Sequence, residues 1–109
     1  MRKLIFLVLM LVSAVGYAQD QEIRLFSHRG GRLEFDENTM SAFQASYDAG
    51  YRGFEIDVRL TKDGKMLLFH DNSLDRCTDA TGPLENLTFK EAMQVTTKKG
   101  NKLCTLDEF

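Results

Sequence analysis

The chain is short and mildly acidic, with 109 residues, 14 Lys or Arg, 16 Asp or Glu and a formal net charge of −2. This balance argues against a nucleic-acid-binding surface, which needs clustered basic side chains. A small anionic substrate, met through a bound cation, is the more natural partner.

The amino-terminal residues 1–18 have the pattern of a secretory signal peptide. A basic start precedes an apolar run over residues 4–12, and the small residues Gly16 and Ala18 stand at positions −3 and −1 of a cleavage site. The run is shorter than the roughly 20 residues of a membrane span, although an uncleaved anchor is the alternative. We therefore expect an exported protein, periplasmic or extracellular, without a stable membrane span after cleavage, whose mature domain is residues 19–109.

The first predicted elements of the mature part are a strand over residues 23–27 and a helix over residues 40–49. The glycine pair at 30–31 between them requires an unusual turn. A polar N-cap, Asn38 or Thr39, and a glycine after the last turn delimit the helix. Three residues at helical spacing form its predicted buried stripe: Met40, Phe43 and Tyr47.

A second strand is predicted over residues 53–60 and a third over 66–70. Alternation assigns one face of the second strand to Phe54, Ile56 and Val58 and the other to Glu55, Asp57 and Arg59. An Asp-Gly turn signal at 63–64 separates the two strands.

The carboxyl-terminal third is predicted to hold a polar loop over residues 71–85 and a short helix. Thr88 and Glu91 form a capping-box pattern that begins this helix, which we expect to reach about Val95. The pattern is repeated at Thr105 and Glu108 with no helix behind it, which indicates a truncated chain. The two cysteines, at 77 and 104, are compatible with a disulfide or with two free thiols.

Four side chains carry the most informative chemistry: His28, Glu55, Asp57 and His70. Both histidines of the chain fall where an apolar run meets a turn, and such groups beside a carboxylate pair suit metal-assisted phosphodiester chemistry. Glu55 and Asp57 point the same way on an ideal strand, where a Ca²⁺ or Mg²⁺ ion would relieve their repulsion. An exposed polar strand face and structural histidines are the alternatives.

Charged residues next to the histidines extend this set. Arg29 offers a planar donor fork matched to phosphate oxygens, or a surface ion pair. Asp71 either orients the imidazole of His70 or begins a turn. Asp75 and Arg76 are interpreted as a loop salt bridge.

The order of these motifs along the chain resembles the glycerophosphodiester phosphodiesterase family. The motifs are His28-Arg29-Gly30, Asp36-Glu37-Asn38-Thr39, Glu55-Ile56-Asp57-Val58, Thr61-Lys62-Asp63-Gly64, His70-Asp71 and Leu74-Asp75-Arg76-Cys77-Thr78. The resemblance implies an α/β fold, the amino-terminal part of a (β/α)₈ TIM-barrel-like phosphodiesterase fold, with its site at the carboxyl ends of the strands. It also implies hydrolysis of glycerophosphodiesters to sn-glycerol 3-phosphate and an alcohol, with a divalent cation, Ca²⁺ or Mg²⁺.

Carried over by motif, the resemblance assigns a role to each candidate residue. His28 and His70 are the catalytic acid/base pair, Arg29 binds the phosphate, and Glu55 and Asp57 bind the metal. The chain departs from the family pattern at Asp36 and Cys104, which both stand where proline is usual.

The length of the chain is the larger departure, because a barrel needs about 250 residues. The family's third metal carboxylate lies on a later strand, and three parallel strands with open edges would leave apolar faces uncovered. A catalytically inactive truncated fragment is therefore the alternative to an active enzyme. A related phospholipid phosphodiesterase is the other alternative.

Overall fold

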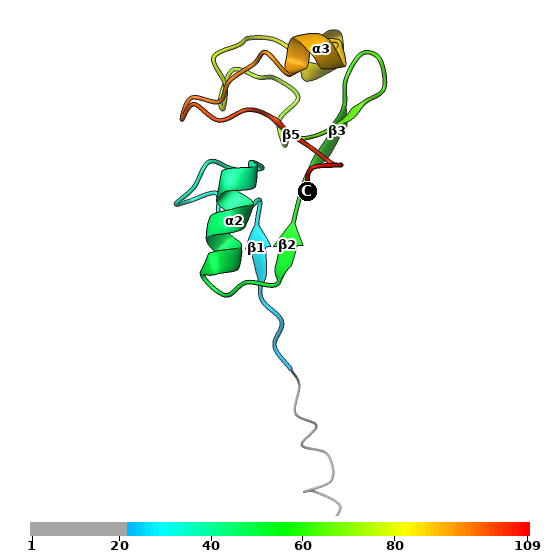
Figure 1. Ribbon diagram of the computed structural model, residues 1–109. Coiled ribbons are helices and arrows are strands. Elements are labelled where there is room, and N and C mark those ends of the chain that lie inside the picture. The colour runs from blue at the N-terminus through cyan, green and yellow to red at the C-terminus, as the bar shows by residue number, and fades with distance from the viewer. Residues whose placement is uncertain (1–21) are drawn as a thin grey trace, which may run out of the picture.

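The computed structural model of the protein describes residues 22–109, which form an α/β arrangement of two small sheets with helices beside them (Figure 1). In chain order the elements are strand β1 (Phe26–His28), helix α2 (Met40–Asp48), strands β2 (Gly53–Glu55), β3 (Val58–Leu60) and β4 (Met66–Leu68), the 3-10 helix η1 (Leu84–Asn86), helix α3 (Phe89–Ala92) and strand β5 (Cys104–Thr105). The predicted signal peptide lies outside the described residues. No helix in the part of the chain that the structure describes is long and apolar enough to cross a membrane.

Strands β1 and β2 form a parallel pair with helix α2 as the crossover between them, as Figure 1 shows. Phe26 lies opposite Gly53, where an added Cβ would come within 2.7 Å of the phenylalanine ring. Glycine at this position therefore leaves room for the ring. The predicted strand 23–27 is wrong in its bounds, since the strand begins at Phe26 and includes His28.

Helix α2 begins and ends close to where the sequence predicts. The Thr39 hydroxyl accepts a hydrogen bond from the Ala42 N–H, so Thr39 rather than Asn38 is the N-cap. Ala49 is the C-cap, and Gly50 follows it with φ of 103°. Such a positive φ is the usual way for a helix to end at glycine.

The buried face of helix α2 differs from the predicted stripe. Phe43 is buried, but Met40 and Tyr47 are 42% and 49% exposed. The helix instead turns the small residues Ala42 and Ser46 inward. Small side chains permit close contact with the turn after β1, where the Ser46 hydroxyl donates to the Gly30 carbonyl at 2.8 Å.

The predicted strand 53–60 is two strands that belong to different sheets. The chain leaves the first sheet after Glu55 and enters the second at Val58. Phe54 and Ile56 share an apolar environment as predicted, but Val58 is 45% exposed and does not join them. At the break, the Asp57 carbonyl accepts from the N–H of Phe69 instead of a neighbouring strand of the first sheet.

Strands β3 and β4 form an antiparallel hairpin, with β5 on the other edge of β4. The predicted turn is confirmed, since the Thr61 N–H donates to the Lys65 carbonyl at 2.9 Å and Gly64 has φ of 77°. The expectation of three parallel strands is wrong: among the described strands only β1 and β2 run parallel. Strand β4 also ends at Leu68, so His70 lies just beyond it.

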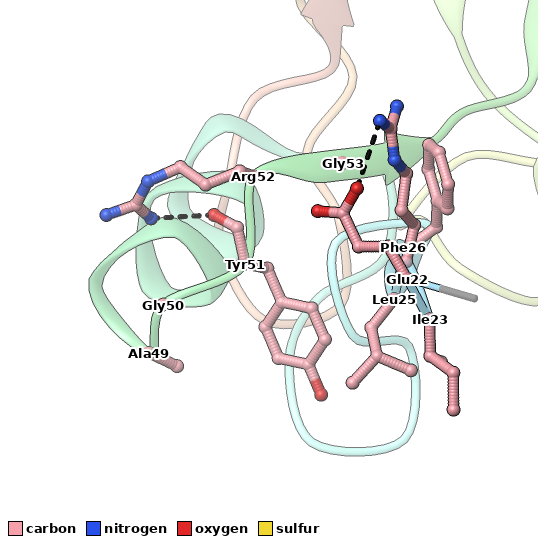
Figure 2. A pocket seen from close by; sticks show the side chains of 10 residues that line it. Glu22, Ile23, Leu25, Phe26, Ala49, Gly50, Tyr51, Arg52 and Gly53 are labelled. Carbon is pink, nitrogen blue, oxygen red and sulfur yellow. Dashed lines mark hydrogen bonds and ion pairs between the residues drawn. The ribbon is translucent and has the colours of Figure 1, made fainter. Parts of the chain in front are cut away.

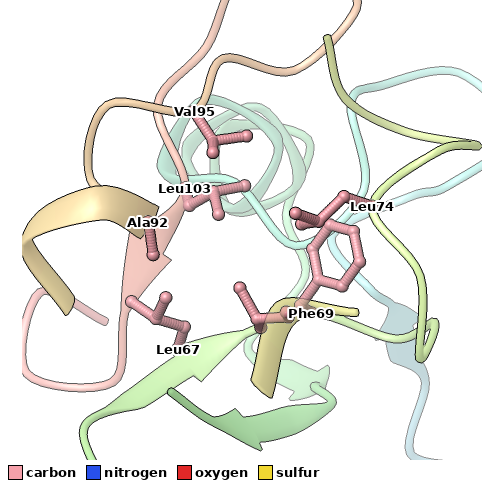
Figure 3. Close-up of a cluster of buried hydrophobic side chains, with 7 residues drawn as sticks. Leu67, Phe69, Leu74, Ala92, Val95 and Leu103 are labelled. Atoms are coloured by element: carbon pink, nitrogen blue, oxygen red, sulfur yellow. The ribbon is translucent and has the colours of Figure 1, made fainter. Parts of the chain in front are cut away.

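The larger apolar cluster lies between the hairpin, the loop after it and helix α3 (Figure 3). Its buried members are Leu67, Phe69, Leu74, Leu84, Ala92, Val95 and Leu103. A smaller cluster of Phe43, Leu68 and Cys104 joins α2 to the second sheet. Because Leu67 and Leu68 point to opposite clusters, β4 anchors the residues that follow it, including His70.

Both predicted capping boxes are present. Thr88 and Glu91 exchange backbone and side-chain hydrogen bonds at the start of α3, which ends at Ala92 rather than at Val95. Thr105 and Glu108 make the same reciprocal bonds, at 2.9 and 3.1 Å. The two cysteines are free thiols.

Candidate active site

The first pair of predicted site residues meets at the carboxyl ends of the parallel strands. His28 and Glu55 are the last residues of β1 and β2 and lie opposite each other in the register. Nε2 of His28 is 3.6 Å from Oε2 of Glu55, and both side chains are about half exposed, 52% and 46%. Because the two strands are parallel, the imidazole and the carboxylate lie at the same solvent-accessible edge, the carboxyl ends of the strands. This is where α/β folds bind ligands.

Arg29 follows His28 in a backbone conformation that side-chain-bearing residues rarely adopt. Its φ is 54°, and its N–H donates to the Glu55 carbonyl at 2.9 Å, which continues the pairing of β1 with β2. Gly30 comes next with φ of 76°, where an added Cβ would lie 2.9 Å from the Cβ of Ala42. This sharp turn requires glycine, and the Arg29 side chain that precedes it is buried beside Asp57.

The Arg29 side chain lies between two carboxylates. It is 8% exposed, with Nη1 at 3.2 Å from Oε1 of Glu37 and Nε at 3.1 Å from Oδ2 of Asp57. The contact with Asp57 is an ion pair without hydrogen-bond alignment, which leaves Nε buried and without a hydrogen-bond partner. Arg29 thus neutralises buried negative charge as well as lying near the site.

Asn38 orients Asp57, a role that the sequence analysis missed. Asn38 is 2% exposed, has φ of 57°, and donates from Nδ2 to Oδ2 of Asp57 at 3.0 Å. A buried asparagine in the left-handed region usually needs support from its surroundings. The available signal was the Glu-Asn-Thr run, which was interpreted only as a helix cap and a family motif.

His70 reaches the same region from the second sheet. Its carbonyl accepts from Nε of Arg59 at 2.9 Å, and its Nδ1 lies 2.7 Å from Oδ1 of Asp71. Of the two interpretations of Asp71, the structure supports contact with the imidazole. The Nε2 side of the ring is not held by Asp71, and the side chain is 43% exposed.

Arg76 joins the His70 side of the site to the Arg29 side. Its guanidinium bonds to Asp71 through Nε at 2.7 Å and to Glu37 through Nη2 at 2.7 Å. Hydrogen bonds from Arg76, more than any other contact, hold the pKa of the Asp71 carboxyl well below its usual range and lower the pKa of Glu37 against the effect of burial. Both acids are therefore ionised, and the predicted salt bridge of Asp75 with Arg76 is wrong, because Arg76 pairs with Asp71 and Glu37 instead.

The structure brings the predicted site residues together in two direct pairs and one relay. His28 contacts Glu55, and Arg29 contacts Asp57. His70 is connected to Arg29 through a relay of Asp71, Arg76 and Glu37. Among residues 22–109, no hydrogen bond or ion pair joins the two histidines directly.

The two candidate metal ligands fit a hard cation in kind. Both offer carboxylate oxygens, which Ca²⁺ and Mg²⁺ prefer, and Glu55 is 46% exposed at the strand edge. One oxygen of Asp57 is already engaged by Arg29 and Asn38. Within the described part of the chain, no group of three or more His, Cys, Asp or Glu side chains could hold a metal ion, so these residues supply only part of a coordination sphere.

A large hollow of the described surface lies away from this chemistry (Figure 2). It has a volume of about 760 Å³ and lies at the amino-terminal ends of β1 and β2. Its lining includes Leu25, Phe26 and Tyr51, and none of the five predicted site residues contributes to it. The site chemistry is instead at the opposite ends of the same strands.

Comparison with known proteins gives concordant matches. Residues 28–109 match the model of the glycerophosphoryl diester phosphodiesterase family. The chain is 41% identical over 68 residues to a glycerophosphodiester phosphodiesterase of Bacillus altitudinis, covering 62% of this chain and 28% of that protein. The chain spans about a third or less of the length of the curated relatives it matches.

Solved structures agree with the sequence matches. A glycerophosphoryl diester phosphodiesterase from Parabacteroides distasonis superposes with a TM-score of 0.73 at 38% identity, over 83% of this chain and 34% of that one. An Oleispira antarctica phosphodiesterase, solved in complex with the product sn-glycerol-3-phosphate, gives a TM-score of 0.74 at 29% identity, over 79% of this chain and 38% of that one.

Proposed function

Because the chain belongs to the glycerophosphoryl diester phosphodiesterase family, we propose that the whole protein hydrolyses glycerophosphodiesters to sn-glycerol 3-phosphate and an alcohol. The described residues form a portion of that family's TIM-barrel fold and do not close a barrel. The product bound to the Oleispira antarctica relative is the one this reaction releases.

The observation that carries the proposal is the clustering of matched chemistry at one strand edge. His28 and Glu55 face each other at the carboxyl ends of β1 and β2, and the next residue, Arg29, pairs with Asp57. An imidazole, a guanidinium and two carboxylates within a few contacts of one another are the groups that hydrolysis of a phosphodiester uses. The relay through Arg76 supports the inclusion of His70 in the same site.

In the proposed reaction, His28 and His70 divide the proton transfers. One imidazole takes the proton from the attacking hydroxyl or water as the new P–O bond forms. The other gives a proton to the oxygen of the departing alcohol as the old P–O bond breaks. Arg29 offers positive charge to the phosphate as negative charge builds on its oxygens.

Glu55 and Asp57 are the proposed metal ligands. A divalent cation, Ca²⁺ or Mg²⁺, would supply charge neutralisation of the phosphate when bound. Asn38 holds Asp57 in place through its amide, at 3.0 Å. The backbone bond from Arg29 N–H to the Glu55 carbonyl fixes the strand end that carries Glu55.

We also propose that the protein is exported, to the periplasm or the cell exterior. The support is the basic, apolar and small-residue pattern of residues 1–18. Mass measurement of the amino terminus of protein recovered from the producing cells tests this proposal. Mature chains that begin near residue 19 are expected, and exclusively uncleaved cytoplasmic chains would contradict it.

An inactive state of the isolated 109-residue chain is the competing proposal. Val58, Leu60 and Met66 share one face of the β3–β4 hairpin and are each about half exposed. Uncovered apolar side chains at this end of the hairpin favour aggregation over catalysis. We accordingly propose that the complete site needs more of the barrel than this chain provides.

Turnover of glycerophosphocholine tests both proposals. The 109-residue chain and the full-length protein are compared with added Ca²⁺ or Mg²⁺ and with chelator, and sn-glycerol 3-phosphate is measured. Metal-dependent turnover by the full-length protein alone is expected. Turnover by the short chain would refute its proposed inactivity, whereas cleavage of sphingomyelin or phosphoinositide alone would replace the proposed substrate class.

A further inference from the structure

Arg76 contacts two carboxylates that come from different segments of the chain, Asp71 and Glu37. Its Nε and Nη2 donate to the two oxygens of Asp71 at 2.7 and 2.9 Å. Its Nη1 and Nη2 donate to the two oxygens of Glu37 at 3.0 and 2.7 Å. Both carboxylates are thus engaged in two-point contact by one planar group, an arrangement that fixes geometry as well as charge.

The contact between Asp71 and His70 determines which nitrogen of the His70 ring carries a proton. Arg76 holds the ionised Asp71 carboxylate in one orientation by two-point contact, and an ionised carboxylate can only accept hydrogen bonds. Because Oδ1 of Asp71 lies 2.7 Å from Nδ1 of His70, Nδ1 must donate its proton. The neutral ring therefore presents a bare Nε2 on its other side.

The Glu37 end holds the Arg29 guanidinium. Glu37 is 11% exposed and places Oε1 within 3.2 Å of Nη1 of Arg29 and 2.7 Å of Nη2 of Arg76. One carboxylate oxygen thus contacts both arginines. Movement of Arg76 would release Glu37 and, with it, the buried contact that orients Arg29.

Stability alone does not account for which segments this arrangement joins. The Arg76 side chain is 51% exposed, and partly solvated ion pairs contribute only modestly to folding. The contacts also join segments that a local loop salt bridge would not join, since Glu37 lies 39 residues before Arg76.

We propose that Arg76 is a positioning residue that, through Asp71, fixes the Nδ1-protonated form of His70 and, through Glu37, holds Arg29 beside it. The inference rests on the proposed function, which makes His70 a proton-transfer group and Arg29 a phosphate ligand. Arginine is required because lysine has a single ammonium group and cannot contact two carboxylates in the same planar, two-point manner.

The first test reads the His70 ring directly in full-length protein carrying ¹⁵N-histidine. The signals of His28 and His70 are identified by replacing each histidine in turn, and imidazole ¹⁵N shifts then distinguish a protonated nitrogen from a bare one. In the unmodified protein at a pH where the ring is neutral, Nδ1 of His70 is expected to be protonated. Arg76→Gln should redistribute the proton toward Nε2 and leave the His28 shifts, which serve as the internal reference, unchanged.

The second test separates positioning from folding. Arg76→Gln is expected to lower kcat for glycerophosphocholine by about 10- to 100-fold, the range found when an outer-shell partner that orients a metal ligand is removed. Arg76→Lys should lower kcat by a smaller factor, with the fold retained. Arg52→Gln is the matched control, because Arg52 directly precedes β2 at the end away from the site. Its guanidinium donates to the carbonyls of Tyr47 and Tyr51 and lies over the Tyr47 ring. This control variant should leave both kcat and the ring shifts unaltered.

Each outcome decides the proposal. If the ¹⁵N shifts of the His70 ring are unchanged in Arg76→Gln, the proposal is overturned. It is also overturned if the proton on the His70 ring is redistributed in Arg76→Gln and Arg76→Lys while kcat stays the same. If the unmodified protein cleaves no glycerophosphodiester, the proposed function fails, but the ring shifts still decide whether Arg76 sets the protonated form of His70. If Arg76→Gln does not fold, the same measurements on Arg76→Lys decide the proposal.

Discussion

Replacing Gly30 by alanine should displace the turn that places Arg29 against Asp57. Gly30 has φ of 76°, and a Cβ there would lie 2.9 Å from the Cβ and 3.1 Å from the backbone carbonyl carbon of Ala42. The left-handed conformation costs a residue with a Cβ about 1–2 kcal/mol. Overpacking against helix α2 adds about 1–3 kcal/mol, so the free energy of unfolding should fall by about 2–5 kcal/mol.

Gly64 provides a matched control for this prediction. It has nearly the same φ, 77°, but an added Cβ would meet nothing within 4 Å. Gly64→Ala should therefore show only the backbone cost of about 1–2 kcal/mol. The difference between the two variants isolates the contact with helix α2.

Urea unfolding of the full-length protein and both variants, followed by circular dichroism, measures these losses. Gly30→Ala should unfold at a lower urea concentration than Gly64→Ala, and its KM for glycerophosphocholine should rise because Arg29 moves. Equal losses of stability in the two variants would show that Gly30 is needed only for its φ. The close packing of α2 on the Arg29 turn would then be refuted.

Three further outcomes are expected. Ionised Asp71 and Glu37 stabilise the folded protein above their ordinary pKa values of 3.8 and 4.5, and this stabilisation is lost as pH falls toward their lowered pKa values in the folded protein. Urea unfolding between about pH 3 and pH 6 should therefore show a declining free energy of unfolding. Arg76→Gln should make that decline shallower. Asp36→Ala should destabilise the protein by about 1–3 kcal/mol in the same assay, because Asp36 accepts hydrogen bonds from two residues of the 97–101 turn; an unchanged midpoint would contradict that linkage. Burial raises the pKa of the Cys104 thiol to about 11, so a thiol reagent at pH 8 should label it only after unfolding, and rapid labelling of the folded protein would refute its burial.

The features that were predictable from the sequence are those set by neighbouring residues. Thr39 and Gly50 bound helix α2, and the Asp-Gly turn joins β3 to β4, because caps and tight turns depend on a few adjacent side chains. The capping box at Thr88 and Glu91 is confirmed for the same reason. His28 was predicted at a strand end, but the predicted strand 53–60 placed Glu55 inside a strand rather than at the end where it faces His28.

The features that the sequence analysis missed depend on contacts between distant segments. The alternation of residues 53–60 continues unbroken through the point where the chain changes sheets, so periodicity could not reveal the break at Ile56 and Asp57. The role of Arg76 depends on Glu37, 39 residues away, and that of Asn38 depends on Asp57. Met40 and Tyr47 fit a buried stripe by spacing, but small side chains determine which face of α2 packs inward.

The asymmetry between the two histidines follows from their partners. His28 lies beside Glu55 at 3.6 Å, a residue proposed to bind the cation, whereas Asp71 contacts Nδ1 of His70 at 2.7 Å. A closely held imidazole with one bare nitrogen suits removal of a proton. The relative pH dependence of His28 and His70 variants would assign the acid and the base.

The most direct test of the central claim is the turnover of glycerophosphocholine by His28→Ala and His70→Ala in the full-length protein. Steady-state release of sn-glycerol 3-phosphate is measured with the divalent cation that supports the unmodified enzyme, and circular dichroism verifies that each variant is folded. Each substitution should abolish turnover, because each removes one of the two proton-transfer groups. Near-normal rates in both folded variants would contradict the central claim.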